Sequence, residues 1–258
     1  MHESDCKQLA KCDKDLIKSL RIEQLEHVTL QHAPTFVASV LGQVIAGSVF
    51  CVNNSYVVKT ASGLYFVSGP VEQTLFQFLE QCMNETGRFT LFVSDPSWQQ
   101  VLEGHKMLRK VTRDAYTLDS TRYEALLRSE PRYRITPITA ATIAQSEEFN
   151  ANYYAEYWGS VEQFLAAGSG FCMVDNGQVI CEATAIFQSA TVSEIDIFTA
   201  EAYRGEGLAK QLAMAFIDHC LEQQRTPHWD CDSDNTASMN LAKKLGFQQP
   251  RQYNVYVR

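Results

Sequence analysis

The first half of the chain alternates short runs of β-branched and aromatic residues with helical repeats. Residues 48–70 hold several such runs, separated by Asn-Asn and Ser-Gly, a pattern typical of β-hairpins. Within residues 71–83, apolar side chains recur at steps of three and four, which predicts an amphipathic helix. Residues 89–95 and 110–118 are predicted strands, and Pro96 marks the start of a further helix. This half is therefore predicted to be a small α/β unit.

The second half shows a longer series of elements. A strand is predicted at 133–139, with helical stretches around 139–150 and 153–167. Asn176-Gly177 lies between two apolar runs and predicts a hairpin, because both positions tolerate positive φ. The remaining elements are a strand at 191–199, a helix from about Leu208, a strand at 228–232, a helix at 235–247 and a strand at 251–258.

The stretch 119–134 is charged and contains Pro131, a composition typical of a connector. A length of 258 residues fits one large domain or two small ones. We therefore predict an N-terminal α/β domain over residues 1–128, non-catalytic or acceptor-shaping, and a second domain over residues 132–258. No internal repeat is visible in the sequence.

Gly205 and Gly207 lie directly before the helix predicted to begin near Leu208. Helix N-termini present unpaired N–H groups and the positive end of the peptide dipoles, so anions bind there. Glycine removes the side chain that would keep a phosphate away. The pattern G-x-G-x-x-G is incomplete because Lys210 occupies its third glycine position, and a Walker A loop is absent. Taken alone, the loop is either a turn with a cap or a phosphate-binding site.

The loop and its surroundings resemble a known family. Arg204, Gly207 and Ala209 match the Arg/Gln-x-x-Gly-x-Gly/Ala loop of the GNAT superfamily of acyl-CoA-dependent N-acyltransferases. Its later Asn-x-x-Ala/Ser and Gly-Phe motif is matched by Asn235, Ser238, Gly246 and Phe247. The resemblance covers about residues 132–258. Within the superfamily the chain is most similar to the zwittermicin A-resistance type, on the stretches YWGSVEQFLAAGSGF and PHWDCDSDNTAS and on the size of the N-terminal extension.

This resemblance implies an α/β (α+β) fold, with a mixed, mostly antiparallel sheet flanked by helices behind a smaller N-terminal domain. It also implies acetyl-CoA as co-substrate, with the pyrophosphate on the amides of 204–209 and the pantetheine arm beside the strand 195–199. The implied cofactor-binding residues are Ile197, Phe198, Thr199, Arg204, Gly205, Glu206, Gly207, Leu208, Ala209 and Asn235. Asn is also a favoured N-cap, so capping alone explains Asn235 equally well.

Three residues are candidates for catalysis. Glu194 and Asp196 share one face of the strand 191–199, where a carboxylate, directly or through water, could take a proton from an attacking ammonium. The alternative is an acidic pair on a solvated strand face. Many superfamily members protonate the leaving thiolate with a Tyr at the position of Ala242. Ser238 is the nearest substitute, although a small residue at a tight helix contact is the alternative reading.

Charge and cysteine content limit the kinds of ligand and partner that we expect for this chain. The 22 Lys and Arg against 30 Asp and Glu argue against a nucleic-acid surface and are compatible with a cationic substrate. The chain has no apolar run long enough to span a membrane and no signal-like start, so we expect a cytoplasmic protein that binds no membrane. The eight cysteines form no CxxC pair, which favours reduced thiols. His228 and Cys231 lack a third ligand at metal spacing, so no metal is expected.

The sequence therefore predicts an acetyl-CoA-dependent N-acetyltransferase that acts on a primary amine of a small molecule, with a homodimer as one option. Two alternatives stay open. The first is a coenzyme-A-binding regulatory module that has lost catalysis, which Ala242 favours. The second is an acetyltransferase for a protein N-terminus or lysine.

Overall fold

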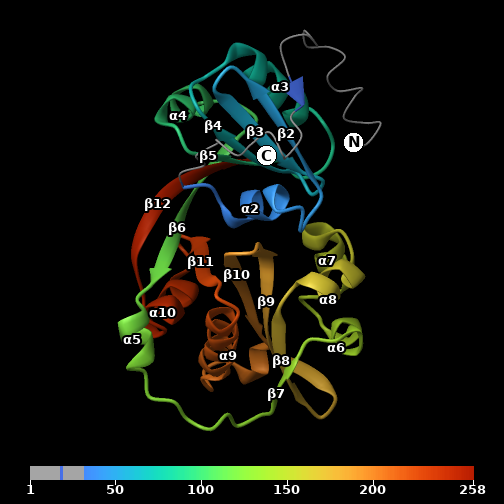
Figure 1. Ribbon diagram of the computed structural model, residues 1–258, viewed down its shortest axis with the longest axis vertical. Helices are drawn as coiled ribbons and strands as arrows, with labels where there is room; N and C mark the ends of the chain where they lie inside the picture. Colours follow the sequence, from blue (N-terminus) through green and yellow to red (C-terminus); the bar gives the residue numbers. More distant parts are fainter. Residues whose placement is uncertain (1–17, 20–31) are drawn as a thin grey trace. The chain divides into compact units, whose positions relative to one another are not determined.

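A computed structural model describes residues 18–19 and 32–258 (Figure 1). The chain divides into two compact units. The first holds the described residues up to Thr112 together with Asn254–Arg258, and the second is Arg113–Tyr253. The predicted division into domains 1–128 and 132–258 stays a prediction. In the described part of the chain, no helix is long and apolar enough to cross a membrane.

The first unit is a sheet with helices packed against it. Its elements are β1 (Lys18–Ser19), α2 (Thr35–Leu41), β2 (Gly47–Val52), β3 (Ser55–Thr60), β4 (Leu64–Ser68), α3 (Gln73–Met83), β5 (Thr90–Val93), α4 (Pro96–Leu102) and the start of β6 (Arg109–Leu118). The strands follow the order β1-β2-β3-β4-β5, and the end of β12 (Phe247–Val257) pairs with β5. The predicted helical face is confirmed, because Leu75, Phe78, Leu79 and Cys82 of α3 are buried.

The second unit is a mixed, mostly antiparallel sheet flanked by helices, as predicted. Its further elements are α5 (Ser120–Glu124), β7 (Ile135–Pro137), α6 (Ala140–Gln145), α7 (Ala151–Trp158), α8 (Val161–Ala167), β8 (Gly170–Asp175), β9 (Gln178–Gln188), β10 (Val192–Thr199), the helical turn Glu201–Tyr203, α9 (Leu208–Glu222), β11 (Thr226–Asp232) and α10 (Thr236–Lys244). The strand order is β12-β6-β11-β10-β9-β8-β7. The hairpin at Asn176-Gly177 is confirmed between β8 and β9.

The two units repeat one order of elements. From β2 to β6, and again from β8 to β12, the chain forms a hairpin, a strand, a helix, a strand, a helix and a strand. In each series the strands on either side of the first helix, β4 with β5 and β10 with β11, are parallel. The strand that extends the second parallel pair is β6, which pairs with β11. A cut between residues 128 and 132 would therefore separate β11 from β6.

The strands β10 and β11 pair only near their beginnings. The parallel register runs from Val192 opposite Thr226 to Glu194 opposite His228. Between Glu194 and Ile195 the register of β10 against β9 shifts, which marks a β-bulge. Bulges increase the local twist and bend of a strand pair. The later parts of β10 and β11 therefore diverge, and a space opens between them.

Glu182 is a carboxylic acid in the core of the second unit. Its side chain lies on β9, where Ser146 donates a hydrogen bond to Oε1 at 2.6 Å, and Oε2 is buried without a partner. Burial raises the pKa of Glu182 from 4.5 to about 7, although the Ser146 hydroxyl and the Phe149 N–H stabilise the anion. The pKa of Glu182 is higher in the folded state than in the unfolded state. Its contribution to the free energy of unfolding is therefore fully present below pH 4.5 and is lost as pH rises toward 7.

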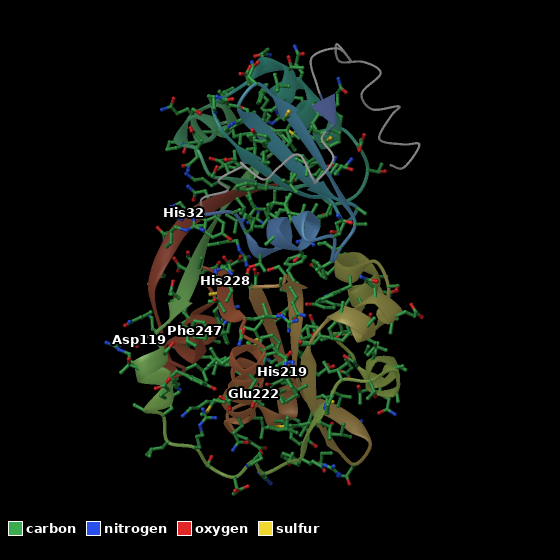
Figure 2. The ribbon with its side chains drawn as sticks, in the orientation of Figure 1. His32, Asp119, His219, Glu222, His228 and Phe247 are labelled. Carbon is green, nitrogen blue, oxygen red and sulfur yellow. The ribbon has the colours of Figure 1, made fainter. Side chains whose placement is uncertain are left out.

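We expect Glu182→Gln to remove this loss. The pKa difference corresponds to about 3 kcal/mol of folding free energy. The wild type should lose stability by up to this amount from pH 5 to pH 8, whereas the variant should not. Urea unfolding midpoints of both proteins at the two pH values measure the effect. Glu222→Gln, an exposed carboxylate on α9 labelled in Figure 2, serves as the control and should change nothing. An identical pH dependence in Glu182→Gln and the wild type would contradict the assignment.

Candidate active site

The loop before α9 combines unusual backbone geometry with open space. Gly205 and Gly207 have φ values of 83° and 82°, in the left-handed region that favours glycine. Gly207 is the N-cap of α9 and no side chain caps this helix. A Cβ added at either glycine would meet no atom within 4 Å. The N–H groups at the start of α9 are therefore accessible to a ligand that approaches along the helix axis.

The corresponding turn of the first unit differs. A Cβ at Gly69, which precedes α3, would lie 2.4 Å from the carbonyl oxygen of Asn54. Glu72 is the N-cap of α3, and its carboxylate accepts a hydrogen bond from Asn53 at 3.0 Å. Packed backbone and a carboxylate disfavour a phosphate at this helix start. Of the two corresponding helix starts, the one at α9 is thus open and the one at α3 is not.

A cavity of about 870 Å³ extends from the loop into the space between β10 and β11. It brings together the predicted cofactor-binding residues Ile197, Phe198, Thr199, Arg204, Gly205, Gly207, Leu208, Ala209 and Asn235. Glu206 does not line it, and its carboxylate pairs with Arg132 at 2.6 Å. Arg204, Lys210 and Lys244 line the cavity, so positive charge accompanies the helix dipole there. A long molecule with a diphosphate at one end fits these residues, because open amides and cations meet at the loop.

Asn235 and Ser238 lie at the start of α10. Asn235 Oδ1 accepts a hydrogen bond from the Ser238 N–H at 3.1 Å, so Asn235 caps the helix as well as lining the cavity. Ser238 Oγ accepts a hydrogen bond from the indole N–H of Trp229 at 3.0 Å. Because an indole only donates, the hydroxyl proton of Ser238 points to other acceptors. One of these is the thiol of Cys231, which also lines the cavity.

Ala242 is fully buried and does not line the cavity. The α10 residues that face the cavity are Ala237, Ser238, Asn240, Leu241 and Lys244. A tyrosine at position 242 would therefore replace core packing instead of reaching the space beside β10. Among the cavity residues of α10, Ser238 remains the hydroxyl candidate for a proton donor.

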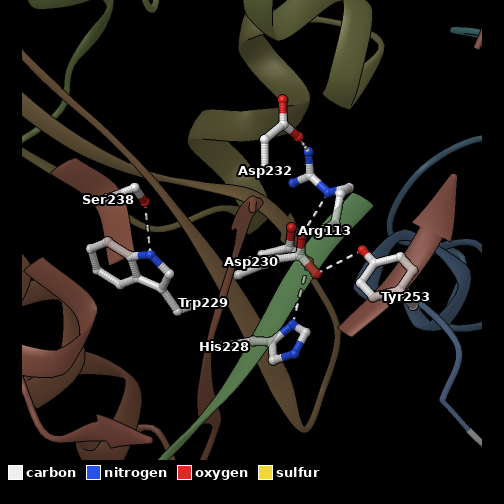
Figure 3. A network of polar contacts seen from close by, with 8 residues as sticks. Arg113, His228, Trp229, Asp230, Asp232, Ser238 and Tyr253 are labelled. Carbon is white, nitrogen blue, oxygen red and sulfur yellow. Dashed lines mark hydrogen bonds and ion pairs between the residues drawn. The ribbon is translucent and has the colours of Figure 1, made fainter. Parts of the chain in front are cut away.

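A polar network crosses β6, β11 and β12 beside the cavity (Figure 3). Arg113 donates from Nε to Asp230 at 2.7 Å and from Nη1 to Asp232 at 2.5 Å. The Tyr253 hydroxyl donates to the other oxygen of Asp230 at 2.7 Å. Burial raises the pKa of Asp230 to about 6, with Arg113 opposing the shift and the charge of Glu194 adding to it. Arg113, Asp230 and Asp232 line the cavity.

The two predicted carboxylates of β10 have different surroundings. Asp196 lines the cavity, but Tyr153 donates to its Oδ2 at 2.9 Å and the Ile197 N–H to its Oδ1 at 2.9 Å. Burial raises the pKa of Asp196, and the charge of Glu194 adds to the shift. Glu194 lies outside the cavity lining, and its Oε2 is 3.5 Å from Nδ1 of His228. Asp196 thus accepts hydrogen bonds from Tyr153 and from the Ile197 N–H, whereas Glu194 lies beside an imidazole.

Sequence reasoning missed Arg113, Asp230 and Tyr253. The alternation in HWDCD signals that His228, Asp230 and Asp232 share a strand face, but nothing local joins them to residues 113 and 253. His228 and Cys231 point to different groups, Glu194 and Ser238. In the described part of the chain, no three His, Cys, Asp or Glu residues form a group that could hold a metal ion.

The sequence of this chain matches a family of known proteins. Residues 26–256 match the GNAT acetyltransferase family model. An uncharacterized N-acetyltransferase, YdfB of Bacillus subtilis (strain 168), is 36% identical over 237 residues, which cover 88% of this chain and 91% of the relative.

Solved structures share the fold. A GCN5-related N-acetyltransferase-like protein from Streptococcus suis 89/1591 has a TM-score of 0.72 at 24% identity, over 92% of this chain and 98% of that one. A tandem GNAT protein from the clavulanic acid biosynthesis pathway has a TM-score of 0.63 at 13% identity, over 94% and 97%. Acetyltransferases of this type use acetyl-CoA, whose diphosphate and pantetheine suit the cavity described above. The chain belongs to the GNAT acetyltransferase family.

Proposed function

We propose that this acetyltransferase acetylates a primary amine of a small, cationic molecule. The observation that carries the proposal is the gathering of Glu194, Asp196 and Asp230 where β10 and β11 diverge. Carboxylates at this position attract an ammonium group and favour its approach to a proton acceptor. The net charge of −8 and the resemblance to the zwittermicin A-resistance type support the same acceptor class. A cytoplasmic location and a homodimer are retained as proposals.

In this proposal, the residues that line the cavity have different roles, which depend on their position. The amides at the start of α9 and the cations Arg204 and Lys244 would hold the diphosphate of acetyl-CoA. When bound, acetyl-CoA supplies the acetyl group as a thioester. The edge of β10 from Ile195 to Thr199 would hold the arm that leads to this thioester. Ser238, polarised by the Trp229 N–H, would donate its proton toward the sulfur.

An acceptor panel with detection of free thiol tests the proposal. We expect release of coenzyme A with putrescine, spermidine or glucosamine, and little with a neutral peptide carrying a free N-terminus and one lysine. The KM of the best amine should rise with salt while kcat stays nearly constant, because salt screens attraction beyond about 10 Å at 0.1 M. Faster turnover of the peptide than of every small amine would favour a protein acceptor. Coenzyme A binding without thiol release from any acceptor would favour a regulatory role.

A further inference from the structure

Glu194 and His228 form the last residue pair of the β10–β11 ladder before the strands diverge. Their side chains lie on the same face of the sheet, with Glu194 Oε2 3.5 Å from His228 Nδ1. The His228 side chain is 27% exposed and that of Glu194 is 13% exposed. The imidazole is therefore the more accessible member of the pair. Neither member of the pair lines the cavity, but Ile195 and Trp229, the next residue on each strand, do.

We propose that His228 accepts the proton of the acceptor ammonium at Nε2, and that Glu194 acts through His228 as a positioning residue. The inference rests on the proposed function and names the proton acceptor of that site. A neutral imidazole that donates its Nδ1 proton to a carboxylate uses Nε2 to accept a proton. A carboxylate behind an imidazole fixes the tautomer and stabilises the imidazolium that forms.

The reaction moves two protons from the nitrogen and balances charge. The ammonium gives a proton to Nε2, so the amine nitrogen regains its lone pair and His228 becomes an imidazolium beside the Glu194 carboxylate. The nitrogen then bonds to the acetyl carbon as the carbon–sulfur bond breaks. Ser238 gives its hydroxyl proton to the departing sulfur, and the second proton that leaves the nitrogen replaces it on Ser238. The imidazolium then returns its proton to solvent.

Charged groups from three strands face the imidazole. Glu194 on β10 and Asp230 on β11 favour the imidazolium, and Arg251 on β12 disfavours it. Burial lowers the pKa of His228, but the hydrogen bond and charge of Glu194 raise it, and the sum lies above the usual 6.5. A base whose pKa is close to the working pH transfers protons effectively. Asp196 is a less suitable acceptor, because Tyr153 and the Ile197 N–H donate to its two oxygens.

Nuclear magnetic resonance of the full chain tests the dyad without turnover. In protein labelled with ¹⁵N-histidine, we expect His228 to carry its proton on Nδ1 when neutral and to titrate above pH 6.5. His228→Gln identifies its signals. Glu194→Gln should lower the pKa of His228, because the carboxylate that stabilises the imidazolium is gone. A neutral tautomer protonated on Nε2, or a pKa that does not respond to Glu194→Gln, would overturn the proposal.

Kinetic measurements distinguish the proton acceptor His228 from its positioning residue Glu194. With spermidine as the probe, His228→Gln should lower kcat/KM at pH 7 by roughly 100-fold or more, and part of the loss should return at high pH, where free amine is abundant. Glu194→Gln should keep the rising limb of the pH profile but move it to lower pH. His228→Asn repeats the test should His228→Gln unfold. A rising limb that persists in His228→Gln and disappears in Asp196→Asn would assign the base to Asp196.

The matched control is His219→Gln. Like His228, His219 does not line the cavity, but it lies on α9 (Figure 2), its Nε2 is 3.2 Å from Ser169 Oγ, and no described carboxylate pairs with it. This variant should keep the wild-type pH profile. If spermidine and every other amine of the panel are inert while the Nδ1 tautomer and its response to Glu194→Gln are found, the acceptor class fails and the dyad stands.

Discussion

Gly207→Val is expected to weaken binding of coenzyme A by roughly 100-fold or more while the fold persists. Valine at this N-cap would occupy the open space in front of the α9 amides and would strain a backbone with φ of 82°. Loss of two charge-assisted hydrogen bonds, each of about 1.5–3 kcal/mol, corresponds to at least that factor. Isothermal titration calorimetry measures the affinity directly. Arg204→Ala should have a smaller effect, because the backbone amides stay in place.

The control for backbone strain is Gly177→Val. Gly177 has φ of 80° and open space around its Cα, like Gly207, but it lies in the β8–β9 hairpin outside the cavity lining. Both valine variants should lose similar stability, and only Gly207→Val should lose affinity. Unchanged affinity in a folded Gly207→Val protein would exclude the loop as the diphosphate site.

Arg113→Met is expected to destabilise the protein by about 3–5 kcal/mol at pH 8, and much less at pH 5. The change leaves the buried Asp230 without its guanidinium partner. In the wild type, burial raises the pKa of Asp230 to about 6 and Arg113 opposes that rise. At pH 5 the Asp230 carboxyl group is mostly protonated in both proteins, so the attraction that is lost is mainly the pair with the half-exposed Asp232. At pH 8 the folded variant must either bury an unpaired Asp230 carboxylate or keep this carboxyl group protonated, although the unfolded chain releases the proton. Either outcome destabilises the variant.

Denaturant unfolding at the two pH values measures this difference. Arg113→Met combined with Asp230→Asn should recover most of the stability at pH 8, because the unpaired charge of Asp230 is removed. Lys110→Met provides the surface comparison, since its 3.2 Å pair with Glu103 is exposed on both sides and should contribute at most about 1 kcal/mol. Equal losses at pH 5 and pH 8 in Arg113→Met would show that the arginine contributes packing and not charge.

These two residues illustrate different ranges of interaction. The Gly207 loop depends on the conformational freedom of glycine and on the helix that follows it, both of which are local in sequence. The Arg113 network joins β6, β11 and β12, whose pairing residues are more than a hundred positions apart in the case of Arg113 and Asp230. The open loop and the polar network are therefore encoded at different distances along the chain.

The sequence by itself determined most of the elements and the place of the glycine loop before α9. The helical face of α3, the hairpin at Asn176-Gly177 and the glycines before α9 follow from side-chain spacing and from allowed φ values, which neighbouring residues set. The motifs at Arg204, Gly207 and Asn235 also lie within single loops and helix starts, so a family pattern could identify them.

Tertiary structure alone decided the register of distant strands and which of their side chains become neighbours. The divergence of β10 and β11 after Glu194 and His228, the pairing of β6 with β11, and the repeat of one element order in both units were not readable from hydrophobic pattern. Local alternation gives the face of a side chain but not its partner, because partners across a sheet are selected by packing of the whole core. For the same reason the burial of Ala242 and the joining of Arg113 and Tyr253 to Asp230 appeared only in the folded chain.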